Sequence, residues 1–437
     1  MRNINITDIK LDIIYLTIFV IVILTGNLDY AILVGMIWVC SYFSRFNKTV
    51  SIVDVNQYFY LIWAFVIIIL CFDVSYIFRH IQFKTIELIA LGISSFFIGD
   101  ITASIYNAYK FNLKSHNVTQ ISAASYNINL VYYWLLLCIS VIMTLVNIYL
   151  SGYIPLINAF NESNVNYLNF SISGYYGLYL AFIISFGYFN YIFYLYTKKM
   201  KYLLIYIFVV LIMIMFLTRQ NLIELMCGMV YINIFLKFKK NDFKKDDMMK
   251  YSIVVLIVLI LFSLLGNFRT KDFNEVSLIK YNLPSVIKWI YSYTAYNVFN
   301  LDNLILNLNE PYFDMSSLYS LIPKIFRKEF EHIYYLEVNN FNVSTYLSTI
   351  YMDFGKIGVC IYSICFGFLS KLIEIKLKLK NIYESDFMVL LIAANVFIFC
   401  NIFSVFSNYY MYLPIVSQIP IAWLMSRFLL IKNTSTT

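Results

Sequence analysis

The sequence predicts an all-α polytopic membrane protein with about 12 transmembrane helices and one large external loop. Hydrophobic residues make up 61% of the 437 residues and charged residues only 13%. The mean hydropathy is +0.74. A soluble domain carries about 45–50% apolar and about 25% charged residues, so this surplus of apolar side chains requires an apolar solvent.

Apolar runs of about the length of a membrane span recur along the chain. We expect spans near residues 11–25, 28–44, 58–77, 86–106, 130–150, 172–196, 202–218, 221–236, 251–267, 346–369, 387–406 and 411–430. No small-residue cleavage site follows the first run, so we expect a retained span and not a signal peptide. The chain then divides into an N-terminal transmembrane bundle (1–267), a large external loop (268–345) and C-terminal transmembrane helices (346–437).

Basic residues recur at every second connection between the expected spans. They are Arg45 and Lys48; Lys110 and Lys114; Lys198, Lys199 and Lys201; Lys237 through Lys250; Lys371 through Lys380; and Arg427 with Lys432. The positive-inside rule places them in the cytoplasm, together with both termini. One connection disagrees, because Arg79, His80 and Lys84 fall outside. Either the rule is locally overridden there, or one early span is misplaced.

The net charge of +8 therefore indicates cytoplasmic anchoring, and we expect no nucleic-acid partner. All seven cysteines fall inside apolar runs without a C-x-x-C pair, which favours neither disulfides nor a metal site. Nothing in the chain resembles a nucleotide-binding loop or a heme site. We expect no cofactor.

The large external loop contains an expected amphipathic helix at 284–299, which includes Tyr293. A basic segment at 321–331 follows, with Lys324, Arg327 and Lys328 close to His332. This segment either binds an anionic substrate or is a solvated loop face. His332 is either structural or a general base.

Two arginines lie at matching depth on the outer side of the expected spans. Arg219 lies at the junction of the seventh and eighth spans, with Glu224 about one turn deeper, and Arg269 lies just beyond the ninth span. Ionisable groups at such depth are costly and usually face a protein interior. Arg219 either binds an anion with support from Glu224, or reaches the interface and pairs with Glu224 for folding. Arg269 is either a second anion ligand or a flanking charge.

Asp353 lies in the first turns of the tenth expected span, two residues after Tyr351. A carboxylate near a helix N-terminus is favoured by the helix dipole, so a structural role is open. A role as the base that accepts a proton from a sugar hydroxyl is equally open. Glu331, Glu337 and His332 are further candidates for that base.

Four segments together resemble the O-antigen polymerase family. They are the run Thr345, Tyr351, Asp353, Phe354, Gly355 and Gly358; Thr-Arg-Gln-Asn at Arg219; Asn-Phe-Arg at Arg269; and Tyr-Thr-Ala-Tyr-Asn-Val-Phe-Asn-Leu at 293–301. The resemblance covers the whole layout, but its motifs lie almost entirely within 216–365.

The resemblance implies a GT-C-like bundle and a metal-independent glycosyltransferase in the bacterial inner membrane. Such an enzyme polymerises undecaprenyl-diphosphate-linked repeat units into O-antigen or capsular polysaccharide, with membrane lipids and a chain-length regulator as candidate partners. Two alternatives stay open: an O-antigen ligase that transfers glycan to lipid A core, and a lipid-linked oligosaccharide flippase. The scarcity of charge at the span centres counts against the flippase.

On this reading two arginines hold the departing diphosphate, and a carboxylate assists the transfer. The expected catalytic residues are Arg219, Arg269 and Asp353. The expected substrate-binding residues are Lys324, Arg327, Lys328, His332, Glu224, Tyr293 and Tyr351.

Overall fold

The protein is a helical membrane protein, as the sequence predicts. The computed structural model describes residues 53–114, 126–161, 170–172, 174–269, 278–322, 326, 335–337, 343–382 and 384–432. Within those residues, seven helices are long and apolar enough to cross a membrane. The expected spans at 11–25 and 28–44 lie outside them.

The long helices follow the apolar runs. They are α4 (Phe83–Lys114), α5 (Leu130–Ser151), α7 (Tyr175–Thr197), α9 (Arg219–Lys239), α10 (Lys245–Arg269), α15 (Tyr346–Leu379) and α16 (Ser385–Phe403). The shorter elements are α3 (Gln57–Ile69), α6 (Pro155–Asn161), α8 (Met200–Met215), α12 (Ser285–Tyr291), the π-helix η2 (Ser292–Tyr296), α13 (Asn297–Asn307), α14 (Ser316–Tyr319), the 3₁₀ turn η4 (Tyr409–Met411), α17 (Leu413–Val416) and α18 (Gln418–Leu429).

Two expected spans are shorter or broken as helices. The run at 58–77 forms a helix only to Ile69, and the chain then continues as a connection to α4. The run at 411–430 is divided at Ser417, between α17 and α18. Both runs are apolar enough to suggest longer spans. The structure differs because hydropathy alone does not locate the residue at which a helix ends.

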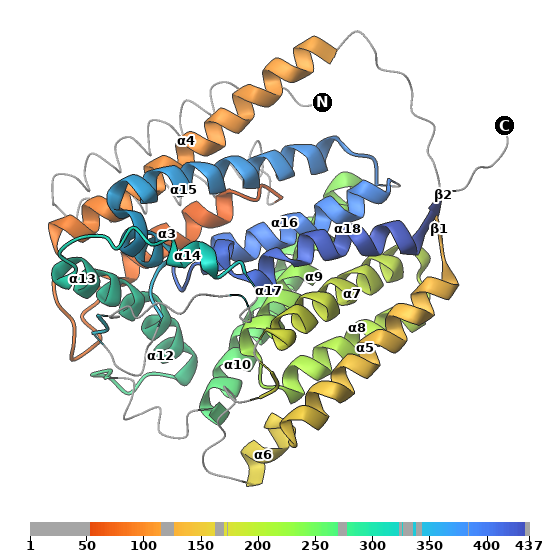
Figure 1. The fold of residues 1–437 in the computed structure, drawn as a ribbon, viewed down its shortest axis with the longest axis horizontal. Helices are drawn as coiled ribbons and strands as arrows, with labels where there is room; N and C mark the ends of the chain where they lie inside the picture. Colours follow the sequence, from red (N-terminus) through yellow and green to blue (C-terminus); the bar gives the residue numbers. More distant parts are fainter. Residues whose placement is uncertain are drawn as a thin grey trace.

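The short helices α12, α13 and α14 gather at one end of the bundle, at the left in Figure 1, which we call the loop end. At the other end, β1 (Tyr126–Ile128) pairs antiparallel with β2 (Leu430–Lys432), with Asn127 opposite Ile431. The sequence did not predict this small sheet. We call this the basic end, because Lys239 and Lys378 meet there through a hydrogen bond from the Lys239 ammonium to the Lys378 carbonyl.

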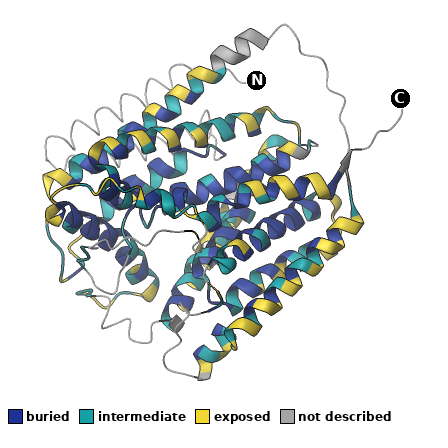
Figure 2. Ribbon diagram, in the orientation of Figure 1, coloured by how far each residue is buried: buried dark blue, intermediate teal, exposed yellow. Residues whose placement is uncertain are grey.

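Helices from before and after the large loop form one bundle. α4 and α15 lie side by side over much of their length (Figure 1). α5 and α10 are peripheral, since only 17% and 22% of their apolar windows are buried, against 78% for α7. Residues coloured as exposed recur along α5 (Figure 2). Apolar faces of this kind suit contact with lipid.

The connection that carries Arg79 lies at the loop end, where its charge has acidic partners. An Arg79 guanidinium nitrogen lies 3.2 Å from Asp302 of α13, and another lies 3.3 Å from Glu337. The fully buried Asp302 carboxylate also accepts hydrogen bonds from the Gln82 backbone N–H and the Thr85 hydroxyl, at 3.0 and 2.6 Å. The large loop thus supplies the counter-charges of this basic connection.

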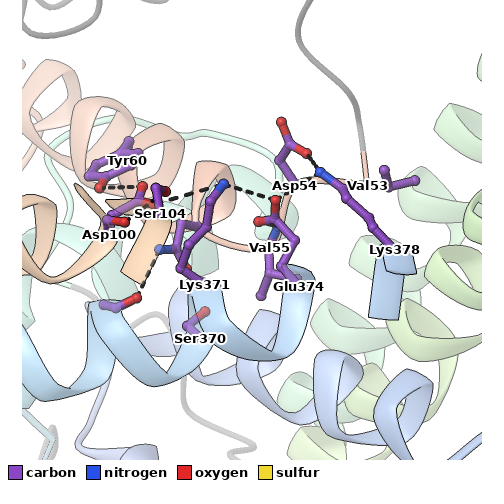
Figure 3. A network of polar contacts seen from close by, with 12 residues as sticks. Val53, Asp54, Val55, Tyr60, Asp100, Ser104, Ser370, Lys371, Glu374 and Lys378 are labelled. Atoms are coloured by element: carbon purple, nitrogen blue, oxygen red, sulfur yellow. Dashed lines mark hydrogen bonds and ion pairs between the residues drawn. The ribbon is translucent and has the colours of Figure 1, made fainter. Parts of the chain in front are cut away.

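A second ionic network braces α15 against α4 and the start of the described chain (Figure 3). Lys371, Glu374 and Lys378 share one face of α15, at helical spacing. Lys371 lies 2.9 Å from Glu374 and 3.8 Å from Asp100 of α4. Lys378 lies 2.8 Å from Glu374 and also pairs with Asp54. Charges alternate along this chain of contacts, so each buried charge has an opposite neighbour.

We predict that Asp302→Ala destabilises the protein, because it leaves the Arg79 guanidinium and the Thr85 hydroxyl without their buried acceptor. The expected loss is about 2 kcal/mol or more, seen as a lower melting temperature in detergent. Glu310→Ala removes an exposed carboxylate from the same loop and is the matched control. Equal melting temperatures for the two variants would show that the Asp302 contacts do not stabilise the fold.

Candidate functional site

Arg219 begins α9 at the loop end and is buried despite its charge. The turn before it contains Leu217 with a positive φ of 54°, which reverses the chain between α8 and α9. Only 6% of Arg219 is exposed. Its guanidinium carbon lies 4.8 Å from the ring centroid of Trp289, 5.2 Å from Phe262 and 5.9 Å from Tyr293. These ring faces attract the cation.

The hydrogen-bonding capacity of this guanidinium is largely unused. Its Nη2 donates to the Tyr293 hydroxyl at 3.3 Å, while Nη1 is buried without a described partner. Among the described residues, no carboxylate lies within ion-pair distance of Arg219. Burial of a charge without a counter-ion is costly, and ring faces offset only part of that cost. The arrangement suits an anionic ligand.

α10 and α12 close the site around Arg219. A Cβ on Gly266 of α10 would lie 2.6 Å from Arg219 Nη1 and 2.7 Å from the Trp289 ring, so only glycine fits there. The Trp289 indole N–H donates to the Asn267 side-chain oxygen at 3.1 Å and joins α12 to α10. We call Arg219, Phe262, Gly266, Trp289 and Tyr293 the arginine cage.

The backbone of Arg269 lies close to this cage. Arg269 ends α10, three residues after Gly266, which is a rise of about 4.5 Å along the helix. Positions three apart share a helix face. The matching depth of Arg219 and Arg269 therefore corresponds to neighbouring positions on α9 and α10. The Arg269 side chain lies outside the described part of the structure.

Glu224 does not pair with Arg219. A separation of five residues turns the two side chains about 140° apart on α9. Arg219 faces α10 and α12, whereas Glu224 faces α18 and accepts a hydrogen bond from the Gln418 side-chain amide. The Tyr188 hydroxyl donates to the Glu224 backbone carbonyl at 2.7 Å. The sequence-based pairing, whether for anion binding or for folding, is thus absent from this structure.

Asp353 anchors part of the large loop. Its buried carboxylate accepts hydrogen bonds from the Ser316 hydroxyl at 2.5 Å and from the Ser317 backbone N–H at 2.6 Å, and also from the Ser317 hydroxyl. The Phe313 backbone N–H donates to the Asp353 carbonyl at 2.8 Å. Gly355, with φ of 62° and ψ of −154°, kinks α15 beside this contact. These contacts favour the structural alternative for Asp353.

The other predicted residues fall in different places. Tyr293 belongs to the arginine cage, while the partly buried Tyr351 packs against a small cluster around Leu304 and Met352. Glu337 is engaged by Arg79. The remaining candidates, Lys324, Arg327, Lys328, Glu331 and His332, lie outside the described residues.

A polar group beside the cage was missed by the sequence analysis. The Tyr409 hydroxyl donates to the Gln220 side-chain oxygen at 3.2 Å, and the Asn408 amide donates to the Thr349 hydroxyl at 3.0 Å. Burial raises the pKa of Tyr409, so its hydroxyl stays protonated and can donate. These residues are uncharged, so neither charge nor depth in the membrane singles them out in the sequence. The proximity of Gln220 to Arg219 was the one available indication.

We predict that Asp353→Asn loosens residues 312–317, because the amide nitrogen cannot accept the bonds that the carboxylate accepts. Loss of one hydrogen bond to a charged group costs about 1.5–3 kcal/mol, so amide hydrogen exchange in 312–317 should be at least about tenfold faster. Asp386→Asn, an exposed change at the start of α16, is the control. Unchanged exchange combined with lost activity would instead favour a direct chemical role for Asp353.

Comparison with known proteins adds no relative. No family model, no curated protein and no solved structure matches this chain.

Proposed function

We propose that the chain is a glycosyltransferase that polymerises undecaprenyl-diphosphate-linked oligosaccharide repeat units into O-antigen or capsular polysaccharide. The observation that carries the proposal is the buried Arg219 guanidinium, which has an unused Nη1 and no described carboxylate in contact. The proposal includes the full layout of 12 spans in a GT-C-like bundle. It also places the chain in the bacterial inner membrane, with both termini cytoplasmic and the loop end outside.

The reaction explains why such a site needs an unpaired cation. The acceptor hydroxyl oxygen forms a bond to the donor's anomeric carbon, while the bond from that carbon to the diphosphate oxygen breaks. Negative charge collects on the departing diphosphate, and the anomeric carbon gains oxocarbenium character. A guanidinium meets two phosphate oxygens with parallel hydrogen bonds and keeps its proton. In the proposal, Arg219 stabilises this growing charge and Arg269 assists from the end of α10.

The surroundings of Arg219 support a lipid-linked substrate. Phe262 and Gly266 of the cage belong to α10, whose apolar window is only 22% buried. The cage therefore adjoins a helix with an outward apolar face, where a polyprenyl tail finds lipid-like surroundings. The aromatic rings hold the guanidinium in place before the anion arrives, so little reorganisation accompanies the reaction.

The incoming hydroxyl must also lose its proton. Asp353 and Glu337 are already engaged, by the start of α14 and by Arg79 respectively. Neither is free in this arrangement to accept the proton. The proposal therefore rests on charge stabilisation by the two arginines, and an oxygen of the departing diphosphate accepts the proton.

We predict that Arg219→Ala and Arg269→Ala abolish polymerisation in a deletion strain complemented with each variant. Loss of a donor to the developing charge costs about 100- to 1000-fold in rate. Arg219→Lys should be nearly as impaired, because an ammonium lacks the planar fork. The measurement is the glycan ladder, which should stop at one repeat unit.

The control is Arg427→Ala. Arg427 also lies over a tryptophan, 5.4 Å from the Trp423 ring centroid, but on α18 toward the basic end. Its loss should leave the ladder intact. An unchanged ladder with Arg219→Ala would refute the catalytic role. In the deletion strain, a ladder that persists on undecaprenyl diphosphate without reaching lipid A core would indicate a ligase. Repeat units held on the cytoplasmic face would indicate a flippase.

A further inference from the structure

Polar atoms without described partners continue from the arginine cage onto two neighbouring side chains. Besides Arg219 Nη1, these atoms are the Gln220 side-chain nitrogen and the Asn408 side-chain oxygen. Asn408 is only 8% exposed. Buried amide atoms are normally hydrogen-bonded, so an unused donor on Gln220 and an unused acceptor on Asn408, next to Tyr409 in the chain, call for an explanation.

These residues form one continuous group at the loop end. Gln220 follows Arg219 on α9 and accepts a hydrogen bond from Tyr409. The ring of Phe406 lies 5.8 Å from that of Tyr293, which bonds Arg219. We call Gln220, Asn408 and Tyr409 the amide rim. It joins the first turn of α9 to the connection between α16 and α17.

The chemistry of the amide rim differs from that of the cage. A diphosphate only accepts hydrogen bonds, so it matches Arg219 but gains nothing from the Asn408 oxygen. A sugar carries hydroxyl groups that both donate and accept, so it can use the Gln220 nitrogen as a donor and the Asn408 oxygen as an acceptor. Phe406 and Tyr409 are partly exposed and offer apolar ring faces to the C–H groups of a sugar ring.

We infer that the amide rim is a carbohydrate subsite, which binds hydroxyl groups of an uncharged sugar next to the diphosphate held by Arg219. The inference rests on the proposed function and deepens it. Arg219 recognises the part of the substrate that all lipid-linked glycans share. Gln220 and Asn408 recognise the sugar attached to it, and are specificity-determining residues.

The test compares the binding of two lipids to the purified full-length protein in nanodiscs. One probe is undecaprenyl diphosphate. The other is the lipid-linked repeat unit extracted from a strain that lacks this protein. The wild type should bind the glycan-bearing lipid at least about tenfold more tightly. Gln220→Leu and Asn408→Leu should each weaken that binding about tenfold, because each leaves a sugar hydroxyl unpaired, and should leave binding of the bare lipid unchanged.

The matched control is Asn395→Leu. Asn395 lies in α16, is 3% exposed, and has no described partner for either amide atom. It should change the binding of neither lipid. If a leucine variant melts early, Gln220→Asn and Asn408→Ser shorten the side chains without placing an apolar group there. The same selective loss is expected from them.

The outcomes separate the two proposals. Equal wild-type affinity for both lipids, or rim variants that weaken both lipids alike, would overturn the subsite and leave the polymerase proposal to the ladder experiment. If the wild type binds neither lipid, the proposed function fails and the subsite fails with it. Selective loss of the glycan-bearing lipid, with Asn395→Leu unchanged, supports the subsite.

Discussion

The cost of burying a charge in apolar surroundings governs this structure. Six charged side chains of the described part are buried, namely Arg219, Glu224, Asp247, Asp302, Asp353 and Glu374. Asp247, Asp302 and Glu374 have cationic partners, and Asp353 is held by three hydrogen bonds. Arg219 and Glu224 have no described counter-charge, and each leaves one polar atom without a partner. Among the described residues, Arg219 and Glu224 are therefore the exceptions to the pairing that the other buried charges follow.

The paired charges hold the segments around Arg219 in place. Asp302 joins α13 to the start of α4, and Asp353 joins α14 to the kinked start of α15. Near the other end, Lys371 joins α15 to Asp100 of α4, and Lys378 joins it to Asp54 at the start of the described chain. The loop segments that carry Trp289 and Tyr293 are thus attached to a rigid bundle, and the rings keep their positions around Arg219. A precise site in a long loop depends on such attachments.

The sequence predicted the parts that depend on hydropathy and depth. Apolar runs gave the order of the long helices, and the shared depth of Arg219 and Arg269 led to α9 and α10. Pairings that depend on helix phase or on distant partners were not predictable in the same way. Glu224 points away from Arg219 because of a five-residue spacing, and the position of Arg79 made sense only with Asp302 beside it. Gln220 and Asn408 are uncharged, so neither depth nor charge indicated them.

On the proposed function, a guanidinium without a described carboxylate beside it is also what differential binding of the transition state requires. On the proposed function, a carboxylate beside Arg219 would lower the cost of burial, but it would compete with the diphosphate in the ground state and in the transition state alike. Trp289 and Phe262 stabilise the cation without neutralising it. On the same proposal, most of its hydrogen-bonding capacity remains for the charge that grows on the leaving group, and that interaction lowers the barrier. A lysine in place of Arg219 would lack both the planar fork of donors and the stacking on the rings. The rings of the arginine cage thus keep Arg219 buried and still able to bind an anion.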